Sequence, residues 1–206
     1  MGLYKNFVSQ TRKPEGFLGQ MMVNGMNNGH AKMADWGMSH LQTIAPETIL
    51  EVGCGGGRNA HALMEKYPSS KLTAVDYSDV SVEKATAYNT DMIRKGRCKV
   101  QQGDVSNLNM NEQYDLATAF ETIYFWPGLE RCFSQVNKAL KTGGTFMIVN
   151  ESDGTDKASL QFESIIDDMK CHTVEEIEGA LRVAGFSKVK TDHHESKPWI
   201  TVIAKK

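Results

Sequence analysis

The sequence predicts a single α/β domain over residues 1–206, with helices on both faces of a mainly parallel, seven-stranded sheet. From Thr48 onward, short apolar runs alternate with longer amphipathic segments, which is the pattern of βα units in a parallel sheet. The last two apolar runs are separated only by residues 195–198. That gap is too short for the crossover helix of a parallel pair, so these runs should form a C-terminal antiparallel hairpin.

The boundaries of each element follow from the apolar periodicity. Helical periodicity without a strand signal in residues 1–45 predicts an N-terminal helical cap over the site, ahead of a core at residues 46–206. Glycines in residues 141–144 and at Gly185 should end two of the core helices. The expected strands are 48–52, 71–75, 98–101, 115–120, 144–150, 187–193 and 199–204, and the expected helices are 58–66, 79–95, 129–140, 157–169 and 173–184.

Composition and charge narrow the classes of function. A net charge of −2 gives no broad basic field, which disfavours large nucleic-acid partners and favours a small-molecule substrate. The four cysteines are scattered singly without zinc-like spacing, so we expect reduced thiols and no metal site. The start resembles no signal peptide, and no apolar run reaches about 18 residues. We therefore expect a cytoplasmic protein without a membrane span, as a monomer or homodimer.

Residues 49–58, with the sequence ILEVGCGGGR, join an apolar run to a glycine-dense turn and then to a helical pattern. Glycines leave no Cβ in the way, so the backbone can turn at positive φ and pack against a ligand. The dinucleotide fingerprint G-x-G-x-x-G fails because its third glycine falls on Arg58. The spacing present is an acid followed by alternate glycines, at Glu51, Gly53, Gly55 and Gly57.

This spacing resembles motif I of the class I S-adenosylmethionine (SAM) dependent methyltransferases, in particular the small-molecule members. The resemblance covers residues 48–150 and implies a Rossmann-like sheet, with SAM as cofactor and S-adenosylhomocysteine (SAH) as product. It also implies that the glycines cradle the amino-acid and ribose parts of SAM, and that Glu51 steadies the methionine ammonium directly or through water. A glycine-rich turn without a ligand is the alternative.

Two acids farther along the chain extend the resemblance. Asp76 ends the second predicted strand, about 20 residues after the glycines, where a ribose-binding acid is expected. Tyr77 would lie where the adenine ring passes. The resemblance implies that Asp104 accepts a hydrogen bond from the adenine amino group while the N–H of Val105 reaches a ring nitrogen. A helix-capping Asp76 and an Asx-type turn at Asp104 are the alternatives.

Aromatic side chains dominate residues 120–127, which follow the fourth predicted strand. The resemblance places this segment beside the sulfonium methyl. Tyr124 is the first candidate for a general base or an orienting hydroxyl, and Trp126 for a pocket wall or a face for a cation, with simple packing as the alternative for both. An Asn/Asp-Pro-Pro-Tyr motif does not occur here, which disfavours methylation of adenine-type amino groups.

Other candidates flank this segment. His30 can accept a proton near neutral pH, with a surface histidine as the alternative. Trp36 belongs to a pattern that resembles the helices closing over SAM in ubiquinone/menaquinone C-methyltransferases, so it is a candidate substrate contact. Glu121, Glu151 and Asp153 follow strands at the same rim. Glu121 is also a candidate cofactor contact. Glu151 is a candidate substrate contact, because carboxylates at this position would favour a cationic or amine-bearing substrate.

Methyl transfer from SAM requires few specific catalytic groups from the protein, because SAM carries an activated methyl group. The enzyme mainly aligns the acceptor in line at about 3–3.5 Å and excludes water. The sequence therefore predicts a SAM-dependent methyltransferase that acts on a small molecule. Two alternatives remain open: a non-catalytic SAM-binding regulatory module, and an NAD-dependent oxidoreductase, which Arg58 disfavours.

Overall fold

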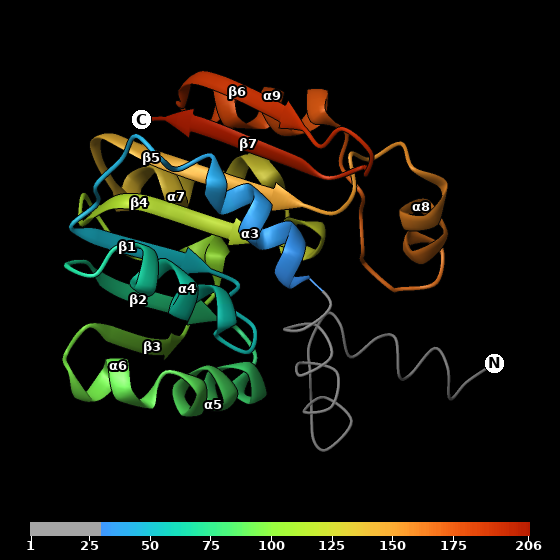
Figure 1. The fold of residues 1–206 in the computed structure, drawn as a ribbon. Helices are drawn as coiled ribbons and strands as arrows, with labels where there is room; N and C mark the ends of the chain where they lie inside the picture. Colours follow the sequence, from blue (N-terminus) through green and yellow to red (C-terminus); the bar gives the residue numbers. More distant parts are fainter. Residues whose placement is uncertain (1–29) are drawn as a thin grey trace.

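The computed structural model describes residues 30–206, so the part of the predicted cap at residues 1–29 lies outside the described residues. Within residues 30–206, seven strands form one sheet in the order β3-β2-β1-β4-β5-β7-β6 (Figure 1). The first five strands are parallel, and β7 runs antiparallel to both β5 and β6. The predicted parallel sheet with a C-terminal antiparallel hairpin is confirmed. The strands are β1 (Thr48–Val52), β2 (Lys71–Asp76), β3 (Cys98–Gln102), β4 (Tyr114–Phe120), β5 (Leu140–Asn150), β6 (Ser187–His193) and β7 (Ile200–Lys205).

Helices cover both faces of the sheet (Figure 1). One face carries α3 (Ala31–Ser39), α4 (Arg58–Lys66), α5 (Asp79–Tyr88) and α6 (Thr90–Arg94), and the other carries α7 (Leu129–Ala139) and α9 (Val174–Val183). The short helix α8 (Lys157–Glu163) has no buried residue and projects from the body. In the part of the chain that the structure describes, no helix has the length and apolar character needed to cross a bilayer.

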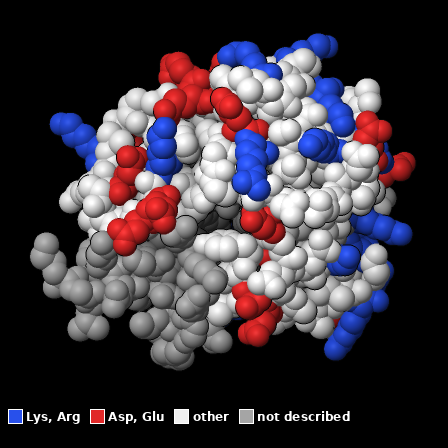
Figure 2. All heavy atoms as spheres, turned by 180° about the vertical axis from the view of Figure 1, so that it is seen from behind, with Lys and Arg blue, Asp and Glu red and all other residues white. Residues whose placement is uncertain are grey.

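The buried apolar side chains form two clusters, one on each face of the sheet. Phe133 and Phe146 belong to the cluster under α7, and Met33 and Leu63 to the cluster under α3 and α4. Because alternate residues of a strand point to opposite faces, a strand buried on both sides is apolar throughout. The four cysteines are free and buried, and acidic and basic side chains are interspersed over the face seen in Figure 2.

The helix predicted at residues 79–95 is broken at Asn89. The side-chain amide of Asn89 donates to the backbone carbonyls of Gly57 at 2.9 Å and Ala85 at 3.0 Å. The backbone at Asn89 (φ −104°, ψ 18°) departs from helical values, and α5 ends and α6 begins there. The sequence pattern alone does not reveal the distant partner Gly57.

Two other predicted boundaries are wrong. Residues 141–144 were expected to end a helix, but α7 ends at Ala139 and these residues lie within β5. Leu140 already pairs with Tyr114, and the register shifts before the regular pairing resumes at Leu116. Gly143 therefore adopts its positive φ of +78° within an irregular strand and not at the end of a helix. The helix expected at 157–169 ends at Glu163.

Asp115 ties the beginning of β4 to the beginning of β1. Its carboxylate accepts hydrogen bonds from the backbone N–H groups of Glu47 and Thr48, from the Thr48 hydroxyl, and from the Lys141 ammonium at 2.9 Å. Partial burial raises the pKa of Asp115, but the bonds from Lys141 and Thr48 outweigh burial and leave the pKa below its ordinary value. The charged form of Asp115 therefore stabilises this strand pair.

Replacing Asp115 by alanine is expected to lower the free energy of unfolding by about 1–3 kcal/mol, because several hydrogen bonds to a charged carboxylate are lost. Since the pKa of Asp115 is lowered in the folded state, this stabilisation is present above about pH 4 and is lost as the pH falls through the folded pKa. Urea denaturation at pH 7 and pH 3 checks this. Glu83→Ala, at an exposed position, serves as the control. The difference in free energy of unfolding between wild type and Asp115→Ala should shrink at pH 3, and an unchanged difference would contradict this explanation.

Candidate functional site

A cavity of about 310 Å³ opens at the carboxyl ends of β1, β2, β3 and β4. The order of the strands reverses between β1 and β4, because β2 and β3 lie on one side of β1 and β4 and β5 on the other. In open α/β sheets, ligands bind outside the carboxyl ends of the strands at such a switch point. The cavity therefore has the expected position for a ligand site.

The glycine turn forms one wall of this cavity. Gly53 (φ +75°) and Gly55 (φ +51°) adopt the left-handed backbone that favours glycine, and both line the cavity. A Cβ on Gly53 would overlap the Thr122 side chain, whereas no protein atom lies within 4 Å of the Cβ position at Gly55. Gly55 is thus the place where a ligand can approach the backbone most closely.

Two members of the predicted motif do not reach the cavity. Gly57 (φ +80°) precedes α4, and a Cβ there would press on Ala85 and Asn89. A glycine at this position therefore allows α4 and α5 to pack closely. Glu51 is 1% exposed, and its Oε2 has no hydrogen-bond partner among the described residues. Burial, and then the nearby Asp76 carboxylate, raise the pKa of Glu51 well above its ordinary value. Neither Gly57 nor Glu51 is therefore among the residues that line the cavity.

Asp76 connects the glycine turn to the second strand. Its carboxylate accepts hydrogen bonds from the N–H of Gly55 at 2.9 Å and from the N–H of Ser78 at 3.0 Å. Burial raises the pKa of Asp76 despite these bonds. Asp76 and Tyr77 both line the cavity. Ser78 caps α5 by accepting from the N–H of Ser81, so the helix-capping alternative for Asp76 is wrong.

Asp104 and Val105 follow β3 and line the same cavity. The Asp104 carboxylate accepts a hydrogen bond from the N–H of Ser106 at 2.8 Å, at the start of the short 3-10 helix Val105–Asn107. The Asx-type turn therefore exists, and it holds the carboxylate at the cavity. The turn and the predicted adenine contact are compatible at this position.

The aromatic segment after β4 is divided between the cavity and the core. Trp126 lines the cavity and is stacked on Phe146, with ring centroids 6.5 Å apart. Tyr124 is 4% exposed and is not among the lining residues; its hydroxyl donates to Glu121 Oε1 at 3.0 Å. Burial raises the pKa of Tyr124 well above its ordinary value, which disfavours the predicted role as general base. The Tyr124 hydroxyl is instead placed to orient the Glu121 carboxylate.

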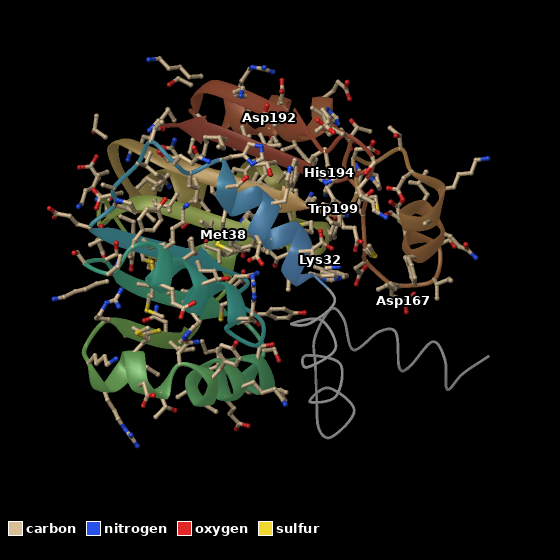
Figure 3. The ribbon with its side chains drawn as sticks, viewed as in Figure 1. Lys32, Met38, Asp167, Asp192, His194 and Trp199 are labelled. Carbon is tan, nitrogen blue, oxygen red and sulfur yellow. The ribbon has the colours of Figure 1, made fainter. Side chains whose placement is uncertain are left out.

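Trp36 does not reach the cavity. The helix α3 packs on the sheet, where a Cβ on Gly37 would overlap the Val149 side chain. This packing turns the Trp36 ring toward His194 and Trp199, at centroid distances of 5.4 and 6.3 Å, and Figure 3 shows both partners beside α3. The described part of the predicted cap is thus a layer of the core, and only its beginning lines the cavity.

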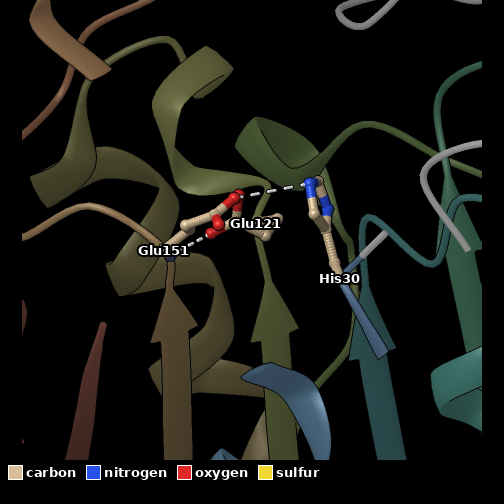
Figure 4. Close-up of side chains that lie close together, drawn as sticks. All are labelled: His30, Glu121 and Glu151. Carbon is tan, nitrogen blue, oxygen red and sulfur yellow. Dashed lines mark hydrogen bonds and ion pairs between the residues drawn. The ribbon is translucent and has the colours of Figure 1, made fainter. Parts of the chain in front are cut away.

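Three predicted residues from distant segments meet at the mouth of the cavity (Figure 4). His30 is the N-cap of α3, Glu121 follows β4 and Glu151 follows β5. One ligand atom from each lies within 4.8 Å of the others, and His30 Nε2 lies 3.6 Å from Glu151 Oε2. Burial raises the pKa of Glu121 to about 6. Asp153, the third carboxylate expected at this rim, instead accepts hydrogen bonds from Thr155.

The cavity also has lining residues that the sequence did not single out. Arg58 begins α4 and forms an ion pair with Asp35 of α3 at 2.6 Å, so it joins the glycine turn to the N-terminal helix. The start of a helix directly after a glycine turn is the signal that could have identified it. The other lining residues are Val52, Cys54, Gly56, Asn59, Val75, Ser81, Gly103, Phe120, Thr122, Phe125 and Pro127.

Comparison with known proteins gives consistent matches. A family model described as a methyltransferase domain matches residues 45–197. Malonyl-[acyl-carrier protein] O-methyltransferase of Priestia megaterium is 32% identical over 107 residues, which cover 52% of this chain and 38% of that protein. Sterol 24-C-methyltransferase erg-4 of Neurospora crassa is 26% identical over 172 residues, which cover 76% and 45%. The chain thus spans less than half the length of these two relatives.

Solved structures share the fold at low sequence identity. A chain from the Haloferax volcanii complex that contains the Trm112 methyltransferase activator has a TM-score of 0.80 at 19% identity, covering 89% of this chain and 93% of its own. Human N-acetylserotonin methyltransferase in complex with SAM has a TM-score of 0.75 at 16% identity, covering 92% and 56%. With the family model matched over most of the sheet, the chain belongs to the class I SAM-dependent methyltransferases.

Proposed function

We propose that this protein transfers a methyl group from SAM to a small-molecule acceptor by in-line displacement. The observation that carries the proposal is the bond between the Asp76 carboxylate and the N–H of Gly55 at 2.9 Å, inside a cavity at the switch point of the sheet. This bond places an acceptor for ribose hydroxyls beside Gly55, whose Cβ position has no protein atom within 4 Å. The residues present therefore suit the adenosyl part of SAM.

The roles of the other cavity residues follow from their positions. Asp104 and Tyr77 would hold the adenine, because they line the cavity next to β3 and β2. SAM supplies the activated methyl group, so the protein has to bind, orient and exclude water. Trp126, which is 9% exposed, gives the acceptor side an apolar wall. The relatives act on an acyl-carrier protein and on sterols, so the family alone does not select the acceptor.

Calorimetric titration with SAH, in buffer containing EDTA, tests cofactor binding. Saturable binding of one SAH per chain is the expected result, and absence of saturable binding would overturn the proposal. Titration with NADH, followed by tryptophan fluorescence, should produce no change if the oxidoreductase alternative is wrong. Incubation with methyl-labelled SAM and a metabolite extract then separates an enzyme from a regulatory module, because only the enzyme moves label into a second compound.

A further inference from the structure

The mouth of the cavity contains a cluster that methyl transfer from SAM does not by itself require. The cluster consists of His30, Glu121 and Glu151, with ligand atoms within 4.8 Å of one another. Two charged carboxylates this close repel each other, and a cation beside them relieves the repulsion. Carboxylate oxygen and imidazole nitrogen are both ligands of divalent metal ions. We propose that this cluster binds a divalent transition-metal ion, of which Mn²⁺ is the representative, on the acceptor side of the SAM site.

The three ligands come from three separate elements that meet at one edge of the sheet. His30 is supplied by α3, Glu121 by the end of β4, and Glu151 by the end of β5 (Figure 4). His30 and Glu121 line the cavity, so an ion held here would face the space reserved for the acceptor. Three protein ligands leave coordination positions open, as catalytic metal sites require.

Glu121 is the fixed member of the cluster. Its Oε1 accepts hydrogen bonds from the Tyr124 hydroxyl at 3.0 Å and from the N–H of Glu151. The Tyr124 hydroxyl in turn accepts from the N–H of Ser152 at 3.1 Å. Both bonds to Glu121 fall on Oε1, so Oε2 remains available to a ligand. Outer partners of this kind orient the carboxylates and imidazoles that bind metals.

The other two members can close on an ion. Ligand atoms about 2.1 Å from an octahedral metal lie about 3 Å apart, so the 3.6 Å between His30 Nε2 and Glu151 Oε2 requires only small side-chain rotations. The side chains of His30 and Glu151 are 32% and 50% exposed, which leaves them room to rotate. A substrate ammonium would meet the same three atoms, but a neutral imidazole nitrogen is a much better ligand for a metal ion.

A metal ion at this position would define the class of acceptor, and this part of the inference rests on the proposed function. A divalent cation lowers the pKa of a bound hydroxyl, so the acceptor oxygen loses its proton to solvent and stays bound as an oxyanion. That oxygen then forms the new O–CH₃ bond while the S–CH₃ bond of SAM breaks and its electron pair remains on sulfur. The acceptor is therefore an oxygen nucleophile such as an enol or a phenol.

Mn²⁺ binding tests the site directly. The full chain, freed of metal with EDTA and dialysed, is titrated with Mn²⁺ at pH 7.5 by calorimetry and by electron paramagnetic resonance. One saturable site is expected, weakened at least 10-fold in His30→Ala and Glu151→Gln. Tyr124→Phe should weaken it by roughly 10–100-fold through Glu121. The control Asp153→Asn removes a neighbouring carboxylate outside the cluster and should bind Mn²⁺ as the wild type does.

The outcomes separate this proposal from the proposed function. Melting temperatures verify that His30→Ala and Glu151→Gln are folded, and both sites are partly exposed, so large losses are not expected. If SAH binds in EDTA but Mn²⁺ does not, or if Mn²⁺ binds equally to wild type and Glu151→Gln, the metal site is overturned and the SAM site stands. A third outcome is that simple primary amines bind saturably, that Glu151→Gln abolishes this binding, and that no Mn²⁺ site is found. This outcome would assign the cluster to an amine substrate and would also overturn the metal site.

Discussion

Gly55→Val is expected to abolish binding of both SAM and SAH. Gly55 lines the cavity, and its Cβ position has no protein atom within 4 Å, so the valine side chain would occupy the space of the ligand. The backbone at φ +51° adds strain of about 1–2 kcal/mol for a residue with a Cβ. We therefore expect no saturable heat on titration with SAH, together with a melting temperature lowered by roughly 2–8 °C.

Gly57→Ala is the matched control, two residues farther along the same turn. Its new methyl group would press on Ala85 and Asn89 rather than on the cavity. This variant should lose stability in thermal melts, while the folded fraction retains nearly the SAH affinity of the wild type. Normal SAH binding by Gly55→Val, or loss of binding by a fully stable Gly57→Ala, would show that the ligand does not lie where the turn places it.

Asp76→Ala is expected to weaken SAH binding by about 2–3 kcal/mol, which corresponds to roughly 30–150-fold in Kd. The carboxylate is 7% exposed, lines the cavity and is the predicted acceptor for the ribose hydroxyls. Its loss also frees the N–H groups of Gly55 and Ser78, so the turn is held less firmly. Bonds to a charged, buried acceptor are about twice as strong as neutral ones, which justifies the size of the effect.

Calorimetry on three variants measures this expectation. Asp76→Asn keeps one acceptor oxygen and should lose less affinity than Asp76→Ala. Asp79→Ala, an exposed acid in the first turn of α5, should bind SAH as the wild type does. An Asp76→Ala protein with unchanged SAH affinity would place the ribose elsewhere.

The sheet could be predicted because its signals are local. Apolar runs, helical spacing and the short gap before β7 each lie within a few residues of the element that they define. Boundaries failed where distant contacts are present: the helix break at Asn89 coincides with a hydrogen bond to Gly57, and the start of β5 pairs with Tyr114. Neither partner is a neighbour in sequence.

The site could be predicted only in part, for the same reason. Spacing identified Gly55, Asp76 and Asp104, which the structure brings to one cavity. It could not distinguish these from Glu51 and Gly57, which match the motif but are directed into the protein by packing. Likewise, nothing local marks Tyr124 as a residue buried behind Glu121.

The cluster for which we propose a metal ion shows the same limit. Sequence spacing indicates no metal site, because the cysteines lie singly and no Cys/His cluster has zinc-like spacing. His30, Glu121 and Glu151 are far apart in the chain and are brought together because α3 begins, and β4 and β5 end, at the same edge of the sheet. A cluster assembled in this way has no motif in the sequence.

The cavity walls come from two parts of the chain. The side predicted to hold the adenosyl group is lined by short segments after β1, β2 and β3, between residues 52 and 105, whereas the opposite side draws on His30, residues 120–127 and Glu151. A substitution on one side can therefore leave the lining of the other side unchanged, because the two sets share no residue.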